Sequence, residues 1–399
     1  MIVCEIIFAV SLALILYTWI GYPALALLLS RVLPRPVRKS DITPAVSVII
    51  TAHNEERDIA AKLDNTLALD YPADKLEVIV ASDCSTDRTD EIVRGYAARG
   101  VILSRQCEHF GKTVAQNAAR RRASGEILVF SDATTLYAPD ALRKIVRSFA
   151  DPEVGCVAGQ LVYVDGKETA TGQGCRSYWG YEKFIKRCES LMGSLIGVSG
   201  CLYAVRRSNY ARLEQDMIDD FVIASEIHLQ GLRTVYEPEA IAIEDTNQRG
   251  RDEFRMRVRV IEQTISALHR YREVLNPLRH GMYAWSMWSH KVLRYGIVLL
   301  LLAMLISSAA LSGQSWFYAA AFSGQAALYF AAFAGWIAER MRVRVGVLSL
   351  PYYFALASLA ALVALLKFLR GEAHVVWEPM RDAGRRMTGT VSRESGAPS

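Results

Sequence analysis

Apolar stretches of two lengths alternate along the chain, and together they predict a folded domain between membrane segments. Residues 6–30 carry no charge and exceed the roughly 20 apolar residues that a helix needs to span a bilayer. Three more long apolar stretches lie near 295–312, 316–337 and 348–366. Between them, short apolar runs alternate with helical patterns, which is typical of an α/β domain.

The middle of the chain has the order of a parallel sheet. Buried strands are predicted at 45–51, 76–82, 101–104 and 126–131. Helices are predicted from Glu56, over 89–99 and over 113–123. This β-α-β order predicts a mostly parallel, doubly wound sheet. Ligands of such sheets bind beyond the carboxyl ends of the strands.

The first apolar stretch has a competing interpretation as a signal peptide. Its length, the missing basic n-region and the lack of a small-x-small cleavage site favour a membrane helix instead. Four basic residues follow directly, at Arg31, Arg35, Arg38 and Lys39. By the positive-inside rule, the domain after them is predicted to be cytoplasmic. Whether the last stretch, which contains Pro351, crosses fully stays open.

The segment 276–291 lies directly before the apolar stretch 295–312 and is rich in aromatic residues. Tyr283, Trp285 and Trp288 are accompanied by His290 and Lys291. Such a mixture favours the lipid headgroup layer, with a buried core helix as the alternative. We therefore divide the chain into an N-terminal transmembrane helix, an α/β domain, an amphipathic interfacial helix, about three transmembrane helices and a polar tail (1–33, 41–270, 271–291, 292–370 and 371–399).

Composition and charge narrow the function classes. The chain is 52% hydrophobic, which favours an integral membrane protein over a disordered one. The net charge of +5 is spread along the chain, so no nucleic-acid partner is predicted. Seven scattered cysteines without a C-x-x-C pair indicate neither a disulfide framework nor a zinc knuckle.

Polar residues follow three of the predicted strands. The first strand leads into Asn54 and Glu55, the second meets Asp83, and the fourth meets Asp132. Each alone is what a helix start prefers. Because parallel strands end at one edge of the sheet, the set predicts a ligand site.

Three familiar motifs are incomplete. Gly111-Lys112-Thr113 lacks the earlier glycine of a P-loop, and 172–174 lacks the third glycine of a dinucleotide fingerprint. Gly197–Gly200 is followed by Cys201, so it is no G-x-S-x-G elbow. Nucleotide hydrolase, dehydrogenase and serine esterase functions are therefore disfavoured.

With these residues in place, the chain resembles the membrane-bound family 2 glycosyltransferases, the group of cellulose, chitin and hyaluronan synthases and bacterial exopolysaccharide enzymes. The resemblance covers roughly 45–290, and its cues are TAHNEE (51–56), ASDCSTDRT (81–89), GKTVAQNAA (111–119), VFSDATT (129–135), VSGCLYAVRR (198–207), DDF (219–221) and QRGRDEF (248–254). It implies a GT-A fold, which is Rossmann-like and mostly parallel. It also implies inverting transfer from a nucleotide sugar, expected to be UDP-linked, to a polysaccharide or lipid-linked acceptor at the membrane.

The resemblance assigns the donor nucleotide to the sheet edge. Asn54 and Glu55 are expected to line the nucleotide pocket, and Asp83 is expected to contact the base. Lys112 is expected near the diphosphate, since a cation at a helix start suits phosphate. A solvated surface lysine is the alternative for Lys112.

The metal and the catalytic base are assigned in the same way. Asp132 begins the family's Asp-x-Asp motif, which holds Mg²⁺ or Mn²⁺, but Thr134 replaces the second acid with a weaker, neutral ligand. A helix is predicted to begin at the pair Asp219 and Asp220 and to end before Gly231. We interpret Asp219 as a helix N-cap and Asp220 as the catalytic base, because adjacent carboxylates repel and keep one of them basic.

The acceptor and diphosphate region is expected at Ser199, Gly200, Gln248 and Arg251. Asp252 stands where the family's Gln-x-x-Arg-Trp motif has tryptophan, so processive and non-processive transfer both stay open. The basic stretch 253–260 is either part of this region or a solvated or membrane-surface face.

Two functions of other classes remain for comparison. A nucleotide-sensing transporter is disfavoured by the lack of intramembrane charge pairs or broken repeats. A nucleotidyltransferase leaves the acidic pair and the segment Gly197–Gly200 without a role.

Overall fold

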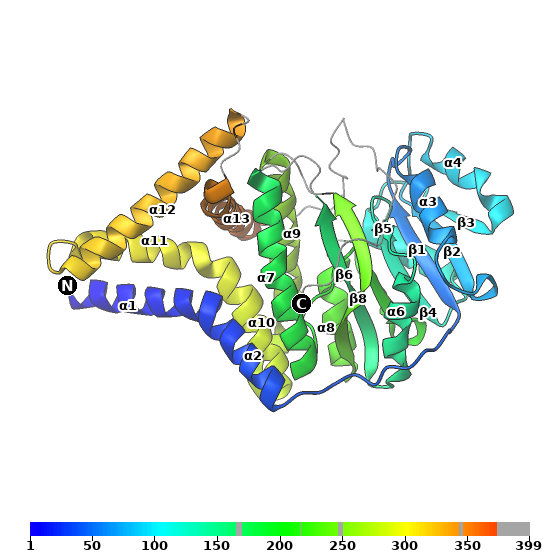
Figure 1. The fold of residues 1–399 in the computed structure, drawn as a ribbon, viewed down its shortest axis with the longest axis horizontal. Coiled ribbons are helices and arrows are strands. Elements are labelled where there is room, and N and C mark those ends of the chain that lie inside the picture. Colours follow the sequence, from blue (N-terminus) through cyan, green and yellow to red (C-terminus); the bar gives the residue numbers. More distant parts are fainter. Residues whose placement is uncertain (165–169, 216, 246–249, 342, 344–345, 373–399) are drawn as a thin grey trace.

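Eight strands form one mixed sheet in the order β3-β2-β1-β4-β7-β6-β8-β5 (Figure 1). The computed structural model describes residues 1–164, 170–215, 217–245, 250–341, 343 and 346–372. The strands are β1 Val46–Ala52, β2 Leu76–Ser82, β3 Val101–Arg105, β4 Ile127–Asp132, β5 Leu136–Tyr137, β6 Val154–Val164, β7 Tyr203–Arg206 and β8 Arg233–Asp245. The α-helices are α1 Ile2–Leu16, α2 Tyr22–Val32, α3 Ile59–Leu67, α4 Thr89–Gly95, α5 Lys112–Arg122, α6 Ala141–Val146, α7 Ala170–Met192, α8 Asp219–Leu229, α9 Gly250–Arg270, α10 Pro277–Met287, α11 Leu293–Leu311, α12 Trp316–Arg340 and α13 Gly346–Leu369.

The predicted β-α-β order is confirmed. The four predicted strands are β1 to β4. Strand β1 lies parallel to β2 and to β4, and β2 lies parallel to β3. Beyond β4 the sheet becomes mixed, since β7 is antiparallel to both β4 and β6. The helix predicted over 89–99 is shorter than expected: α4 ends at Gly95, and a 3₁₀ turn Ala97–Arg99 follows.

Both faces of the sheet are buried because successive side chains of a strand point to opposite sides. Val48 and Ile50 belong to one hydrophobic core, to which α3 and α6 also contribute. Ile49 and Phe130 belong to the core on the opposite face, to which α5 and α8 contribute. This two-sided burial explains the continuous apolar runs in the sequence.

The polar strand ends predicted to share one edge do so. Ala52 at the end of β1 pairs in register with Ser82 at the end of β2. On the other side of β1, Thr51 pairs with Asp132 at the end of β4. The backbone N–H of Asp83 donates to the carbonyl of Ala52 at 2.9 Å. The segments after these strands therefore meet at one edge of the sheet.

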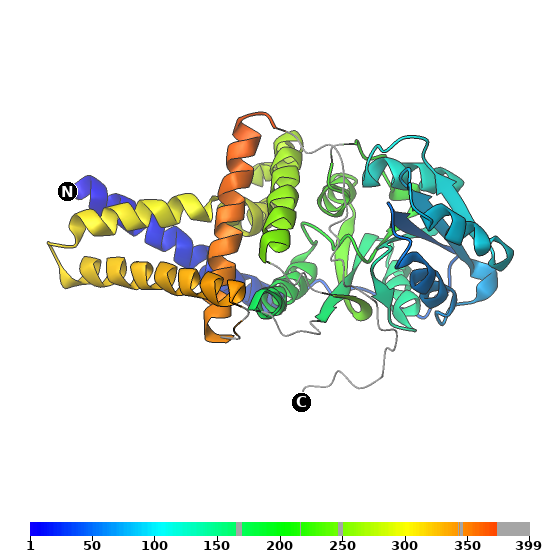
Figure 2. The same ribbon diagram turned by 90° about the horizontal axis from the view of Figure 1, so that it is seen from above.

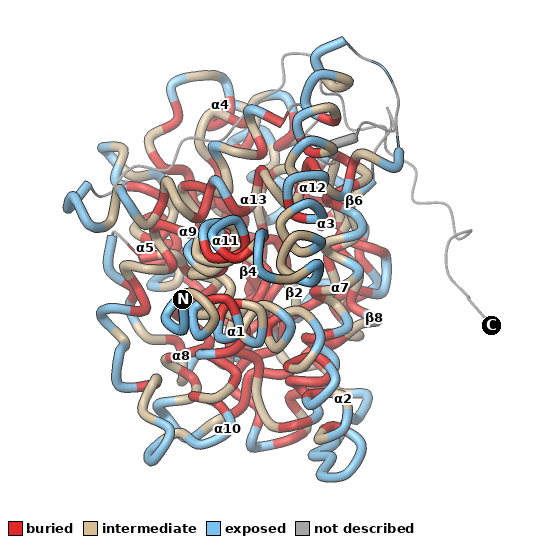
Figure 3. The backbone as a smooth tube through the Cα atoms, turned by 90° about the vertical axis from the view of Figure 1, so that its left-hand side faces the viewer, coloured by how far each residue is buried: buried red, intermediate tan, exposed pale blue. Residues whose placement is uncertain are grey.

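Four helical segments are long and apolar enough to cross a membrane: Ile2–Val32, Pro277–Leu311, Trp316–Arg340 and Gly346–Leu369. Figure 1 shows α1, α11 and α12 extending together away from the sheet. Figure 2, the view from above, shows α13 beside α9, and α9 lies next to the sheet. Much of the surface of α1 and α12 is exposed in Figure 3, including large apolar side chains such as Trp316 and Phe330. Exposed apolar helices of this kind suit a lipid surrounding.

The helix predicted over 271–291 buries one face against the protein, while Leu278 and Met282 on α10 are exposed, and its place at the membrane interface stays a prediction. Tyr283 and Met287 pack in a hydrophobic cluster with residues of α8 and α9. His290 lies in the π-helical turn Trp288–Val292, which links α10 to α11, and is 4% exposed. The aromatic residues thus face the protein interior because α8 and α9 cover this helix, and only Trp288 is largely exposed.

Candidate active site

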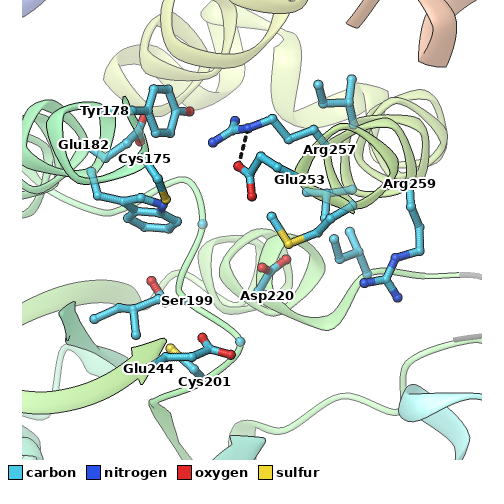
Figure 4. A pocket seen from close by; sticks show the side chains of 18 of the residues that line it. Cys175, Tyr178, Glu182, Ser199, Cys201, Asp220, Glu244, Glu253, Arg257 and Arg259 are labelled. Atoms are coloured by element: carbon cyan, nitrogen blue, oxygen red, sulfur yellow. Dashed lines mark hydrogen bonds and ion pairs between the residues drawn. The ribbon is translucent and has the colours of Figure 1, made fainter. Parts of the chain in front are cut away.

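One cavity of about 840 Å³ connects the edge of the sheet with α7, α9 and α13. Nine of the predicted site residues line it: Asn54, Glu55, Lys112, Asp132, Thr134, Ser199, Gly200, Asp219 and Asp220. Figure 4 shows Ser199, Asp220 and Glu244 around one part of this cavity, with Glu253 and Arg257 on α9 across from them. Asn54 and Asp220, which are 166 positions apart in the sequence, both line this cavity.

Lys112 joins two acids at the centre of the sheet edge. Its Nζ lies 2.8 Å from Asp132 Oδ1 and 3.4 Å from Asp219 Oδ2. Burial lowers the pKa of Lys112, but the negative charges of the two acids outweigh burial and raise the pKa above its ordinary value. The alternative of a solvated surface lysine is therefore wrong, and Lys112 is a fixed cation at the start of α5.

Asp219 has a different place from the one predicted. The helix α8 begins at Asp219, and its N-cap is Ile218 with no side-chain cap. The Asp219 carboxylate instead accepts hydrogen bonds from Gln116 Nε2 at 2.8 Å and from the Tyr203 hydroxyl at 3.1 Å. The N-cap interpretation is wrong because tertiary donors from α5 and β7 hold this carboxylate away from the helix end.

Asp220 follows directly and faces the cavity (Figure 4). Burial, together with the neighbouring charge of Asp219, raises the pKa of Asp220 to about 6. Lys112 opposes both effects. A carboxylate whose pKa lies near neutral pH is suited to take up a proton during a reaction.

Thr134 has an acidic neighbour that sequence reasoning missed. The Thr134 hydroxyl donates to Glu244 Oε1 at 3.2 Å, and Glu244 lies near the end of β8. Asp132, Thr134 and Glu244 line the same part of the cavity. Two carboxylates and a hydroxyl are oxygen donors of the kind that Mg²⁺ and Mn²⁺ prefer. The residues present therefore fit a divalent metal although Thr134 replaces the second acid of the motif.

A second group of possible metal ligands lies at the ends of β1 and β2. One ligand atom each from His53, Asp83 and His109 lie within 4.8 Å of one another. The two imidazole rings are stacked, with centroids 3.9 Å apart. Asp83 is fully buried, and its oxygens accept from the backbone N–H groups of Phe110 at 3.0 Å and Gly111 at 2.7 Å.

Asp83 consequently has a structural role that was not predicted. Its carboxylate orients the loop that leads into Lys112, and Asp83 is not among the residues that line the cavity. The expected contact with the base therefore stays a prediction.

Asn54 connects the loops after β1 and β2. It has a φ of 54°, in the left-handed region that asparagine tolerates better than most residues. Its Oδ1 accepts from the backbone N–H groups of Thr86 at 2.6 Å and Asp87 at 3.2 Å. The loop around Asp83 is thereby fixed to the rim of the cavity.

The predicted acceptor region is only partly at the cavity. Ser199 and Gly200 line it, Arg251 is exposed and is not among its lining residues, and Gln248 lies outside the described residues. The stretch 253–260 is largely covered by the protein, although Arg255 is exposed: Glu253 is 1% exposed, and its carboxylate accepts from Arg257 Nε at 2.8 Å. Helix α9 is a wall of the cavity because it packs between α13 and the sheet edge.

Comparison with known proteins agrees with this geometry. Residues 47–213 match the family described as glycosyl transferase family 2. The chain contains a glycosyl transferase family 2 domain. This domain has the predicted α/β GT-A fold. The mixed, mostly parallel sheet and the similar solved structure described below both support this.

Two curated relatives are similar over this part. A poly-beta-1,6-N-acetyl-D-glucosamine synthase of Staphylococcus aureus (strain COL) is 28% identical over 223 residues, 52% of this chain and 51% of the relative. An N-acetylglucosaminyltransferase of Rhizobium sp. (strain N33) is 32% identical over 227 residues, 51% of this chain and 49% of the relative. The chain spans about half the length of the curated relatives it matches.

A solved structure extends the likeness to most of the chain. The mannosyltransferase PcManGT from Pyrobaculum calidifontis, in complex with GDP-Man and Mn²⁺, has a TM-score of 0.67 and 26% sequence identity. The match covers 89% of this chain and 99% of that one. The likeness thus includes helices outside the family 2 domain.

Proposed function

We propose that this protein is an inverting glycosyltransferase. It transfers a sugar from a nucleotide-sugar donor, expected to be UDP-linked, to a polysaccharide or lipid-linked acceptor at the membrane. The α/β domain, residues 41–270, faces the cytoplasm in this proposal, and the apolar helices anchor it. The family 2 domain and the two curated relatives that handle N-acetylglucosamine support this assignment.

The observation that carries the proposal is the position of Lys112 between two acids. Its ammonium group contacts Asp132, where a donor diphosphate is expected, and Asp219, which precedes Asp220. The same lysine lowers the pKa of Asp220 against the effect of burial. Lys112 is therefore a single cation that connects the expected diphosphate site at Asp132 with the proposed base Asp220.

In the proposed mechanism, Asp220 takes the proton of an acceptor hydroxyl. The hydroxyl oxygen then forms a bond to the anomeric carbon as the bond from that carbon to the donor diphosphate breaks, so the configuration inverts. Lys112 stabilises the negative charge that develops on the departing diphosphate. A well-placed general base contributes about 10²- to 10⁴-fold in rate.

A divalent cation fits beside this centre. Asp132 and Glu244 would hold Mg²⁺ or Mn²⁺, with the Thr134 hydroxyl between them. The bound ion would neutralise part of the charge of the donor diphosphate. PcManGT, which was solved with Mn²⁺, supports a metal of this class.

A second form of the proposal is non-processive transfer to a polyprenyl phosphate or other lipid acceptor. The chain has Asp252 where processive relatives are expected to have tryptophan. PcManGT, a mannosyltransferase by name, resembles this chain over 89% of its length. The aspartate at position 252 favours a single sugar transfer over polymer synthesis.

The test is release of nucleoside diphosphate. The full chain, purified in detergent, is supplied with UDP- and GDP-linked sugars, Mg²⁺ or Mn²⁺ and membrane lipid extract, and diphosphate release is measured for each donor. Release from at least one donor, abolished by EDTA, is the expected result. No release from any donor would refute the proposed activity.

A further inference from the structure

Two further lysines, Lys186 and Lys291, line the cavity. Lys186 on α7 is 8% exposed, and its Nζ donates to the Ser199 hydroxyl at 2.9 Å. Lys291, in the turn Trp288–Val292, is half-buried. Among the residues that the structure describes, neither ammonium group has a carboxylate within 4.0 Å.

The carboxylates in this part of the cavity already have other cations. Glu182 pairs with His290 at 3.1 Å and with Arg294. Glu189 accepts from the Tyr22 hydroxyl at 2.6 Å and lies 2.7 Å from His290 Nδ1. Glu182 and Asp220 act on both lysines only from beyond ion-pair distance. Each ammonium group has three N–H donors, so the two lysines make this part of the cavity suited to an anion.

The lysines also lie close to the proposed reaction centre. Both act on Asp220, whose pKa their positive charges lower against the larger effect of burial. Ser199, which Lys186 contacts, is next to Gly200, where an added Cβ would lie 3.1 Å from Lys112 Nζ and 3.8 Å from Asp220 Oδ2. An anion bound by Lys186 and Lys291 is thus adjacent to Asp220.

Another part of the cavity wall is mainly aromatic, and the Arg294 guanidinium stacks on it. Trp19, Tyr181 and Phe354 line it, and the Trp19 ring lies 5.6 Å from Tyr181 and 5.8 Å from Phe354, centroid to centroid. Trp19 and Phe354 belong to segments long and apolar enough to cross a membrane. An apolar ligand chain can pass from this wall to a surrounding bilayer.

We propose that Lys186 and Lys291 bind the phosphate of a lipid-linked sugar acceptor. The lipid tail leaves the cavity along Trp19 and Phe354, and the acceptor sugar reaches Asp220. This inference rests on the proposed function and specifies its acceptor. A neutral polysaccharide is disfavoured as the occupant because it carries no charge to pair with the two ammonium groups.

Binding can be tested without turnover. Farnesyl phosphate, farnesol, inorganic phosphate and a chitin oligosaccharide are titrated into the full chain in detergent, and Tm shifts give the affinities. We expect farnesyl phosphate to bind most tightly. Lys186→Met and Lys291→Met should each weaken it roughly 10- to 100-fold, as expected for loss of a hydrogen bond to a charged group, and leave farnesol unchanged.

Two further variants separate charge from structure. Lys183→Met, on the same helix but outside the cavity lining, should leave the affinity for farnesyl phosphate unchanged. Lys186→Arg keeps the charge and should retain most of that affinity. A loss of affinity with Lys183→Met, or equal losses with Lys186→Arg and Lys186→Met, would overturn the assignment.

The remaining outcomes are equally decisive. Equal binding of farnesol and farnesyl phosphate, or tighter binding of the oligosaccharide, would refute the phosphate subsite. If the lysine variants weaken UDP binding as much as farnesyl phosphate binding, the lysines serve the donor instead. Because these titrations need no sugar transfer, a chain that releases no nucleoside diphosphate still tests the subsite, and the two proposals fail separately.

Discussion

Replacing Asp220 by asparagine tests the proposed base most directly. The change keeps the size of the side chain and removes its ability to accept a proton. We expect kcat for nucleoside diphosphate release to fall by about 10²- to 10⁴-fold, the range that a general base contributes. Donor binding should change little, because Lys112 contacts Asp132 and Asp219 and, among the described residues, forms no ion pair with Asp220.

The pH dependence of kcat/KM gives a second quantitative test of Asp220. Because burial and the charge of Asp219 raise the pKa of Asp220 to about 6, the carboxylate is protonated below that pH. We expect kcat/KM of the wild type to fall about tenfold per pH unit below pH 6. The residual activity of Asp220→Asn should lack this acidic limb.

Asp220→Asn should raise the stability of the folded protein although it lowers the activity. The difference between a pKa of about 6 and the ordinary 3.8 corresponds to about 3 kcal/mol. Since the folded state favours protonated Asp220, ionisation costs stability as the pH rises from 3.8 to 6, and the cost is complete above pH 6. Asp220→Asn should therefore have a higher Tm above pH 6, with the advantage vanishing near pH 3.8.

The assay compares diphosphate release and Tm of the same purified preparations. Asp74→Asn is the control, since Asp74 is an exposed carboxylate far from the cavity in sequence. It should change neither quantity. Full activity in Asp220→Asn would refute the mechanism. Loss of activity together with a lower Tm would show that Asp220 supports the fold rather than the reaction.

Four further substitutions test other parts of the molecule. Thr134→Asp should tighten Mn²⁺ binding and Glu244→Gln should weaken it, measured by calorimetry, because both change the oxygen donors around one cation; unchanged affinity in both would place the metal elsewhere. Lys112→Met removes a charge that lowers the pKa of Asp220, so the acidic limb of kcat/KM should move above pH 6, and an unmoved limb would contradict the coupling. Lys62 is fully buried without a hydrogen-bond partner among the described residues, and burial lowers its pKa to about 7. Its protonation costs stability below pH 7, the cost declines as the pH rises to 10.5, and Lys62→Met should thus raise Tm most at low pH; an equal rise at all pH values would refute this.

Sequence patterns predicted the first half of the sheet closely. The runs that became β1 to β4 are apolar on both faces, and the intervening helices show their own periodicity, so the signal is local. The shared edge of Asn54, Asp83 and Asp132 followed from the parallel order alone. The later strands were not predicted individually, because β5 has two residues and β8 pairs with β6 across a long helix.

Side-chain partners were decided by the tertiary structure. Asp219 was expected to cap α8 from local preference, but Gln116 and Tyr203 arrive from other elements and bind its carboxylate. Thr134 was expected to leave the metal motif weak, and Glu244, which is 110 residues away, lies beside it. No local pattern signals such pairs, since the donors and acceptors meet only when the sheet and its helices have packed.

By itself, the sequence determined the α/β order of the family 2 domain, the four long apolar segments and the acids and lysine of the sheet edge. These depend on periodicity, length and residue type, which act over short stretches of chain. Only the tertiary structure decided that Lys112 joins Asp132 to Asp219, and that Lys186 and Lys291 lack acidic partners among the described residues. Charge compensation depends on distances between groups from separate elements, and the packed fold alone establishes those distances.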